Sequence, residues 1–362
     1  MNGVGQNRGS GTTELDPWYL ENLVCPVDGL RLRLEGAFLI SECGRRYPVV
    51  EGMPVMLLND VVETIGVARV SLDLALAIAS GESVAAAPLY VETLGITDNE
   101  RANTRILHAM GGEYDAVVAT MIGATSGIAY KHLIGGQVPY AIPTFRFPAT
   151  APGSLLDIGC NWGRWTIAAG RNGYNAVGID PQLGAVLAAR RVAAQTGTNA
   201  RFVVGDARYL PFRKDMFDYV WSYSVLQHFS REDVEVSLIE IARVSREGAT
   251  IRIQMANAFG VRSLYHMLRR KFRVPTNFEV RYWSPFQLNK VFSRTIGVTQ
   301  INADCFFGLG LQWSDFARMT FTGKLALLIS ETLRRLSEAV YPLRWFADSL
   351  FCTARLQRGD GW

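Results

Sequence analysis

The feature that most constrains this chain is a series of four short apolar runs, each of which ends in small or acidic residues. They occupy residues 155–163, 176–180, 202–207 and 217–222. Short apolar runs bounded by turn residues are typical of buried strands, and the segment after the first run, 165–169, has helical spacing. The order of strand, turn, helix and strand predicts an α/β fold built from βαβ units.

The ends of these runs place candidate ligand-binding groups. Gly159 and Gly163 stand in the turn after the first run, where they can adopt positive φ and let backbone N–H groups approach a ligand. Asp180 follows roughly twenty residues later, which is where an acidic residue meets a ribose in nucleotide-binding βαβ units. We therefore expect Asp180 to bind the ribose of the ligand.

Together with residues 210–212 and 225–228, these runs resemble the class I SAM-dependent methyltransferases (methyltransferase type 11-like) over residues 151–258. The resemblance implies a Rossmann-like seven-stranded sheet with helical insertions. It also implies S-adenosyl-L-methionine (SAM) as cofactor and S-adenosyl-L-homocysteine as product. In that family a carboxylate after the third strand binds the adenine amino group, and the next backbone amide binds the ring. The cofactor-binding residues that it implies here are Asp157, Gly159, Cys160, Asn161, Gly163, Asp180, Asp206, Ala207 and Ser222.

Two other kinds of protein were weighed against this interpretation. A dinucleotide-binding oxidoreductase would need the glycine pattern GxGxxG, but Asn161 and Arg164 occupy its second and third positions. The methyltransferase family also usually has glycine where Asn161 stands, and asparagine is the next best residue in the left-handed region. A SAM-binding regulatory module without turnover would keep Asp180 and Asp206, and the sequence does not show the loss of an acceptor side that would mark it.

Residues 19–60 form a separate unit in which short strands alternate with turn residues. The unit resembles the small zinc-ribbon-like proteins that activate RNA and protein methyltransferases, here fused in cis. Zinc-bearing relatives hold the metal with two Cys-x-x-Cys knuckles, whereas Cys25 is paired here with Asp28 and Cys43 with Ile40. Isoleucine cannot be the fourth ligand of a tetrahedral site, so we predict a degenerate, metal-free unit.

The remaining chain divides by pattern. We predict a disordered tail over 1–18, a helical lid or connector over 61–150, and a methyltransferase core over 151–362 with helical insertions near 260–297 and 311–346. The absence of a long uninterrupted apolar run, and of an apolar segment at the start, predicts no membrane span and a cytoplasmic location. The five cysteines are scattered, which favours a reducing compartment over a disulfide framework.

The acceptor side is less well determined by the sequence. His228 follows the fourth run just before a capping pattern at Ser230 and Asp233, so it is the candidate general base; the alternative is a loop histidine bonded to a backbone carbonyl. The loop at 222–225 lacks the Asn/Asp-Pro-Pro-Tyr type motif of nucleobase and glutamine N-methylases. A net charge of +4 is small for a nucleic-acid partner.

We therefore expect O-methylation of a small-molecule or glycan-type acceptor. A basic cluster over 262–273 could dock a phosphate or carboxylate of an anionic acceptor. The alternative is an RNA or protein methyltransferase with a cis-fused activator. The sequence does not predict the oligomeric state.

Overall fold

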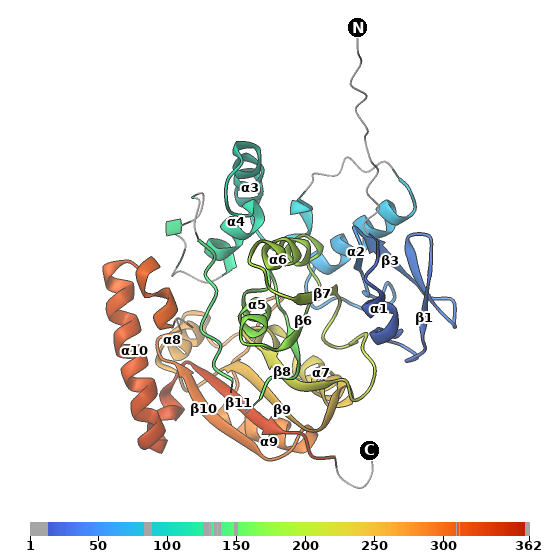
Figure 1. Ribbon diagram of the computed structural model, residues 1–362. Helices are drawn as coiled ribbons and strands as arrows, with labels where there is room; N and C mark the ends of the chain where they lie inside the picture. The colour runs from blue at the N-terminus through green and yellow to red at the C-terminus, as the bar shows by residue number, and fades with distance from the viewer. Residues whose placement is uncertain are drawn as a thin grey trace.

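The computed structural model describes residues 14–82, 89–125, 130, 132–133, 136, 139–147, 151–308, 310 and 312–358. Its centre is a seven-stranded sheet with the strand order β10-β11-β9-β8-β5-β6-β7 (Figure 1). The strands are β5 (Ser154–Ile158), β6 (Asn175–Asp180), β7 (Ala200–Val204), β8 (Phe217–Ser222), β9 (Ser245–Ala256), β10 (Thr299–Cys305) and β11 (Ser349–Arg355). The first five are parallel, and β11 inserts antiparallel between β9 and β10. The predicted seven-stranded Rossmann-like sheet is confirmed.

Alternating side chains of the strands pack into hydrophobic cores on opposite faces of this sheet. Leu156 and Ile158 of β5 pack in one core with α7 (Arg231–Val244) and α9 (Pro285–Thr295). Leu155, which precedes them, packs instead with Trp165 of α5 (Arg164–Arg171). Because consecutive strand residues point to opposite faces, the fully apolar runs seen in the sequence are what a sheet covered on both faces requires.

The helix α6 (Leu183–Gln195) lies on the same face as α5, where a third core joins it to a group of N-terminal helices. These are α2 (Val67–Ala79), α3 (Asp98–Met110) and α4 (Ala116–Thr125). The helical spacing expected in residues 61–150 is thus found, and α3 begins with a complete capping box between Thr97 and Glu100. Ser126 to Ala129 lie outside the described residues.

The N-terminal unit is a four-stranded antiparallel sheet that lies beside β7, at the right of Figure 1. Its strands are β1 (Leu32–Glu35), β2 (Phe38–Ser41), β3 (Arg46–Val50) and β4 (Met53–Pro54). Before them, Asp16 caps the helix α1 (Pro17–Asn22), and Leu15 is buried. A helix therefore begins inside the predicted 1–18 tail, because Asp16 and Pro17 supply a helix start that composition did not reveal. Residues 1–13 lie outside the described part.

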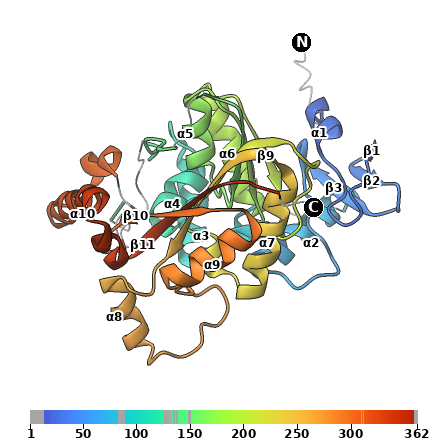
Figure 2. The same cartoon turned by 90° about the horizontal axis from the view of Figure 1, so that it is seen from below.

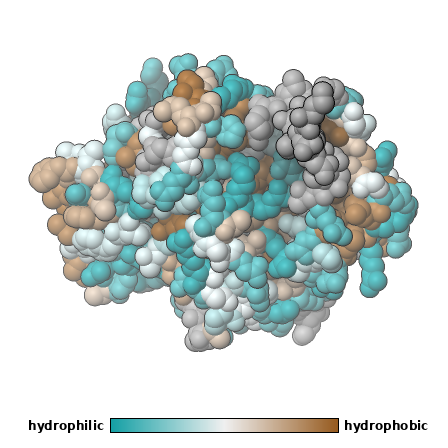
Figure 3. Space-filling model, turned by 45° about the horizontal axis from the view of Figure 1, so that its top comes forward, coloured by the Kyte–Doolittle hydropathy of each residue, from teal (hydrophilic) through white to brown (hydrophobic). Residues whose placement is uncertain are grey.

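Beyond β9 come the two predicted helical insertions. The first contains α8 (Val261–Arg269) and α9, and the second is dominated by α10 (Phe321–Ala339), which packs on β10. Apolar side chains gather at the left edge of the molecule over α10 (Figure 3), where Phe321, Leu325 and Leu328 are exposed. Among the helices of the described chain, none has both the length and the apolar run that crossing a bilayer requires.

Candidate active site

A cavity of about 580 Å³ lies at the carboxyl ends of the parallel strands, the edge at which open α/β sheets bind ligands. Its volume falls within the range of small-molecule and cofactor sites. One part of its wall comes from the turns after β5, β6 and β7. The other part comes from the loop after β8 and from the insertion that contains α8. The cavity therefore has one wall made by the turns of the first three sequence motifs, and a second wall in which the loop of the fourth motif meets an insertion that the motifs do not predict.

The turn after β5 takes the conformations that the sequence predicted. Gly159 has φ +74°, and Asn161, which replaces the expected glycine, has φ +49°. A Cβ at Gly159 would stand 2.1 Å from a methyl carbon of Val225, so no other residue fits there. The turn therefore borders the cavity directly, through Gly159, Cys160 and Asn161.

Asp180 lies at the end of β6 in the cavity wall, with 6% of its surface exposed. Its carboxylate accepts hydrogen bonds from the backbone N–H groups of Asn161 and Gln182, both at 3.0 Å. Burial raises the pKa of this carboxyl to about 6, although both backbone hydrogen bonds act in the opposite direction. Each carboxylate oxygen keeps a free lone pair, so Asp180 can still accept hydrogen bonds from two ribose hydroxyls.

Asp206 and Ala207 also line the cavity. The Arg208 side chain holds the Asp206 carboxylate through a contact of 2.8 Å and also donates to Asp233 and to the Val62 carbonyl. This arginine therefore fixes the loop after β7 against α7 and against the chain that leaves the N-terminal unit. The carboxylate keeps lone pairs for an adenine amino group, and the residues present fit SAM.

Three of the residues assigned to the cofactor from the sequence do not border the cavity as described. Asp157 is buried beneath the turn, where it accepts a 2.6 Å hydrogen bond from the Thr166 hydroxyl, and burial raises its pKa to about 7. Ser222 is also buried and donates to the Ile158 carbonyl. Gly163 has φ +79°, and a Cβ there would meet Phe202. The Asp157 and Ser222 side chains therefore support the turn from beneath, and the assignment of all three residues to the cofactor stays a prediction.

His228 does line the cavity, as expected for the loop after the fourth strand. Its Nδ1 bonds to the Phe278 carbonyl at 2.7 Å, and its ring stacks on that of Phe278. Because a carbonyl can only accept, Nδ1 carries the hydrogen, and Nε2 of the neutral ring is left with a free lone pair. Burial lowers the pKa of His228 to about 4, so the ring is neutral at physiological pH but is a weak base.

The rest of the acceptor wall contains polar groups that the sequence did not assign. The Tyr223 hydroxyl donates to Asp304 at 2.8 Å, and the Ser349 hydroxyl donates to the same carboxylate oxygen. Burial raises the pKa of Asp304 and also that of Tyr223. This group is a buried, mutually bonded network that fixes the Tyr223 ring at the cavity wall.

Asp348 is the second unassigned acid. It lines the cavity and is 4% exposed, and its Oδ1 accepts from the Ser263 N–H at the start of α8. Its Oδ2 has no hydrogen-bond partner within the described part of the chain. Arg262 and His266, from the same helix, complete this side of the wall. No local sequence signal marks Asp304 or Asp348, because each reaches the site through the pairing of β11 with β9 and β10, which are distant from it in the sequence.

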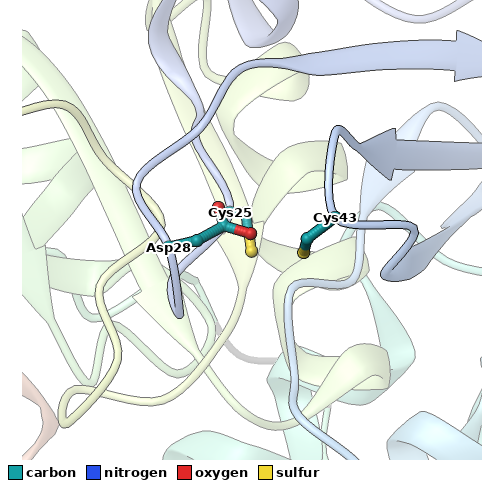
Figure 4. Close-up of side chains that lie close together, drawn as sticks. All are labelled: Cys25, Asp28 and Cys43. Carbon is teal, nitrogen blue, oxygen red and sulfur yellow. The ribbon is translucent and has the colours of Figure 1, made fainter.

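The N-terminal unit brings together three metal-type ligands (Figure 4). The ligand atoms of Cys25, Asp28 and Cys43 lie within 4.8 Å of one another. Cys25 Sγ is also 3.1 Å from the Tyr47 hydroxyl, and a hydrogen bond from Cys43 is the largest cause of the lowered pKa of Asp28. The cluster thus offers three ligands where a tetrahedral zinc site needs four, and it does not include Ile40. A metal-free unit remains a prediction.

Comparison with known proteins agrees with this geometry. Residues 155–248 match the family described as "Methyltransferase domain". The chain is 31% identical over 150 residues to the norajmaline N-methyltransferase of Rauvolfia serpentina, a match that covers 40% of this chain and 50% of that protein. The chain thus spans half the length of this relative.

A UPF0434 protein of Maricaulis maris (strain MCS10) is 51% identical over 49 residues, which are 13% of this chain and 78% of that protein. Among solved structures, a chain from a complex of the Haloferax volcanii Trm112 methyltransferase activator is 21% identical, with a TM-score of 0.42, and the match covers 60% of this chain and 87% of that one. Because this score is below 0.5, the fold assignment rests on the strand order. Residues 155–248, with their ordered motifs and the cavity that they help to build, form a SAM-dependent methyltransferase domain, and over 49 residues the chain belongs to the UPF0434 family.

Proposed function

We propose that this methyltransferase transfers the methyl group of SAM to an oxygen atom of a small-molecule or glycan-type acceptor. The observation that carries the proposal is the second wall of the cavity. It is built from this chain's own loops and presents groups that recognise hydroxyls: Nε2 of His228 and Oδ2 of Asp348, neither bonded to another described residue, and the side chain of Gln227. A site of this size, with few convergent polar groups, suits a small acceptor.

The cofactor supplies an activated methyl group on a sulfonium, and the chain's own residues do the rest. Asp180 and the loop at Asp206 orient the cofactor, while the Tyr223 network and Asp348 shape the space beside it. Methyl transfer is an in-line displacement, so positioning and exclusion of water supply much of the rate. An acceptor hydroxyl must also lose its proton, and in this proposal Nε2 of His228 takes it.

Two features favour other acceptors strongly enough to be tested. The plant relative is named as an N-methyltransferase, so amines belong among the substrates assayed. The UPF0434-related segment, together with the docking of the N-terminal unit beside β7, supports the alternative of an RNA or protein acceptor with a cis-fused activator. The net charge of +4 argues against a large anionic polymer as the acceptor.

The deciding experiment is a SAM-consumption assay with the full chain. Pooled sugars, nucleotide sugars, phenols, amines and RNA are supplied separately, and formation of S-adenosylhomocysteine is followed. The proposal expects turnover with a hydroxyl-bearing pool and none with RNA. Turnover with the amine or RNA pool alone would contradict it. Tight SAM binding with no turnover in any pool would favour the regulatory module.

A further inference from the structure

The helix α8 has an unusual orientation of its side chains. Val261, Leu264, Tyr265 and Leu268 follow the spacing of one helix face, and they are 62%, 45%, 58% and 55% exposed. A surface helix normally turns such a stripe toward the core. Here the stripe faces solvent within the described structure, over a helix that Figure 2 shows projecting from the body of the molecule.

The opposite face of α8 is the polar one. Arg262, Ser263 and His266 line the cavity, and Arg262 donates to the Phe307 carbonyl. The helix is therefore polar toward the protein and apolar toward the outside. Since its inner face forms part of the acceptor wall, whatever covers the outer face lies next to the acceptor end of the cavity.

The chain that follows α8 extends the same surface. Phe272 is 62% exposed and Val274 is 81% exposed. Two exposed cations precede these residues: Arg269 ends the helix, and Lys271 follows it. Neither has an ion-pair partner in the part of the chain that the structure describes. Arg273, by contrast, is held by Glu279. Exposed apolar side chains and free positive charges thus alternate on one short projection.

We propose that this projection, α8 with residues 271–274, docks on an anionic lipid surface. A membrane interface satisfies both kinds of side chain at once, because its headgroups take up the cations while the acyl boundary takes up the apolar stripe. The exposed stripe on α10 is less basic, because α10 contains Glu331 and Glu338, both paired with Arg334, whereas residues 261–274 contain five cations and no acidic residue. The charge complementarity therefore selects α8 as the lipid-facing element.

The docking has a consequence for the acceptor that rests on the proposed function. If α8 lies in the interface, the wall formed by Arg262 and His266 stands at the membrane surface. The acceptor would then be a hydroxyl group carried on a membrane-borne amphiphile. Lipid binding and methyl transfer are measured separately. The docking proposal can therefore be refuted while the proposed function stands, and the proposed function can be refuted while the docking proposal stands.

The test is co-sedimentation of the full chain with vesicles of phosphatidylcholine alone or with 30% phosphatidylglycerol. The chain should bind the anionic vesicles and bind more weakly at high salt. Leu264→Gln with Leu268→Gln should lower the partition coefficient by about tenfold or more, whereas Leu325→Gln with Leu328→Gln on α10 is the matched control and should bind like wild type. Arg269→Gln or Lys271→Gln should each lower binding about fivefold on anionic vesicles.

SAM affinity by calorimetry should be unchanged in all these variants, which shows that the fold and the cofactor half are intact. Absence of binding to anionic vesicles would overturn the proposal, as would an equal loss in the α10 control. If instead analytical ultracentrifugation shows a dimer that the Leu264 and Leu268 substitutions abolish, while vesicles are not bound, the face is an interface between copies of this chain and the lipid assignment is wrong.

Discussion

The affinity for SAM should depend on pH through Asp180. Burial raises the pKa of this carboxyl to about 6 in the free protein, where it accepts hydrogen bonds from the backbone N–H groups of Asn161 and Gln182. Hydroxyl donors of a ribose favour the carboxylate over the carboxylic acid, so binding lowers the pKa. Below about pH 6 the protein must therefore release a proton when it binds the cofactor.

The size of the effect follows from that shift. Between pH 7 and pH 5 the free carboxyl changes from mostly ionised to roughly nine-tenths protonated, so the SAM dissociation constant should rise about tenfold, which is about 1.4 kcal/mol. Above pH 7 the affinity should level off. Asp180→Ala should lose about 1.5–3 kcal/mol of binding at neutral pH, the range for hydrogen bonds to a charged group.

Isothermal titration calorimetry at pH 5, 6, 7 and 8 measures both the dissociation constant and the proton released. Asp180→Asn keeps the side-chain volume and removes the titration, so its residual pH dependence belongs to the ligand and to other groups. Asp157→Asn is the matched control, because it removes a second buried carboxyl that does not border the cavity. A wild-type affinity that is flat from pH 5 to 8, or an unchanged affinity in Asp180→Asn, would refute the reasoning.

Three further predictions concern other groups. His228→Ala should leave SAM affinity nearly intact and lower turnover by roughly two to four orders of magnitude, with the acid limb of the wild-type pH profile near 4, measured by steady-state kinetics. Asp157→Asn should raise the free energy of unfolding by roughly 2–4 kcal/mol at pH 8 and hardly at pH 4. The buried Asp157 carboxyl of the wild type has a pKa of about 7, so it destabilises the fold only when it is ionised; denaturant titrations at the two pH values measure this. Metal analysis of the purified chain should give well under one zinc, since Cys25, Asp28 and Cys43 lack a fourth ligand.

Each of these has an outcome that would contradict it. Near-normal turnover in His228→Ala would make the ring structural and direct attention to Asp348 or Tyr223. Loss of SAM binding in the same variant would place the ring in the cofactor half. A destabilised Asp157→Asn at pH 8 would mean that the carboxylate has a cationic partner. Stoichiometric, chelator-resistant zinc would show that the knuckles recruit a ligand from elsewhere.

The cofactor half of the site could be predicted from the sequence because its information is local. Each motif is a buried strand followed directly by its turn, and parallel strands bring their carboxyl ends to one edge. Gly159, Asn161 and Asp180 therefore fall into place once the strands are recognised. Asp157 lies in the strand itself, and its side chain is directed under the turn toward Thr166, so its assignment to the cofactor stays a prediction.

The acceptor half could not be predicted in the same way. Asp304 ends β10 and Asp348 precedes β11, and both reach the site only because β11 inserts antiparallel between β9 and β10. That topology depends on long-range pairing, for which the sequence carries no periodic signal. The orientation of α8 was hidden as well, because its spacing shows an amphipathic helix but not which face is turned outward.

The N-terminal unit is joined to the cofactor loop by backbone contacts rather than by its cysteine cluster. Val55 pairs with Val204 at the end of β7, and Leu23 pairs with Phe212, so the two bridges stand at either end of the segment that carries Asp206. Between them, Arg208 ties the Asp206 carboxylate to the Val62 carbonyl. The unit therefore braces the loop that faces the adenine position, and this brace does not require a metal. The backbone pairs that contact the methyltransferase sheet do not involve the side chains of Cys25, Asp28 or Cys43.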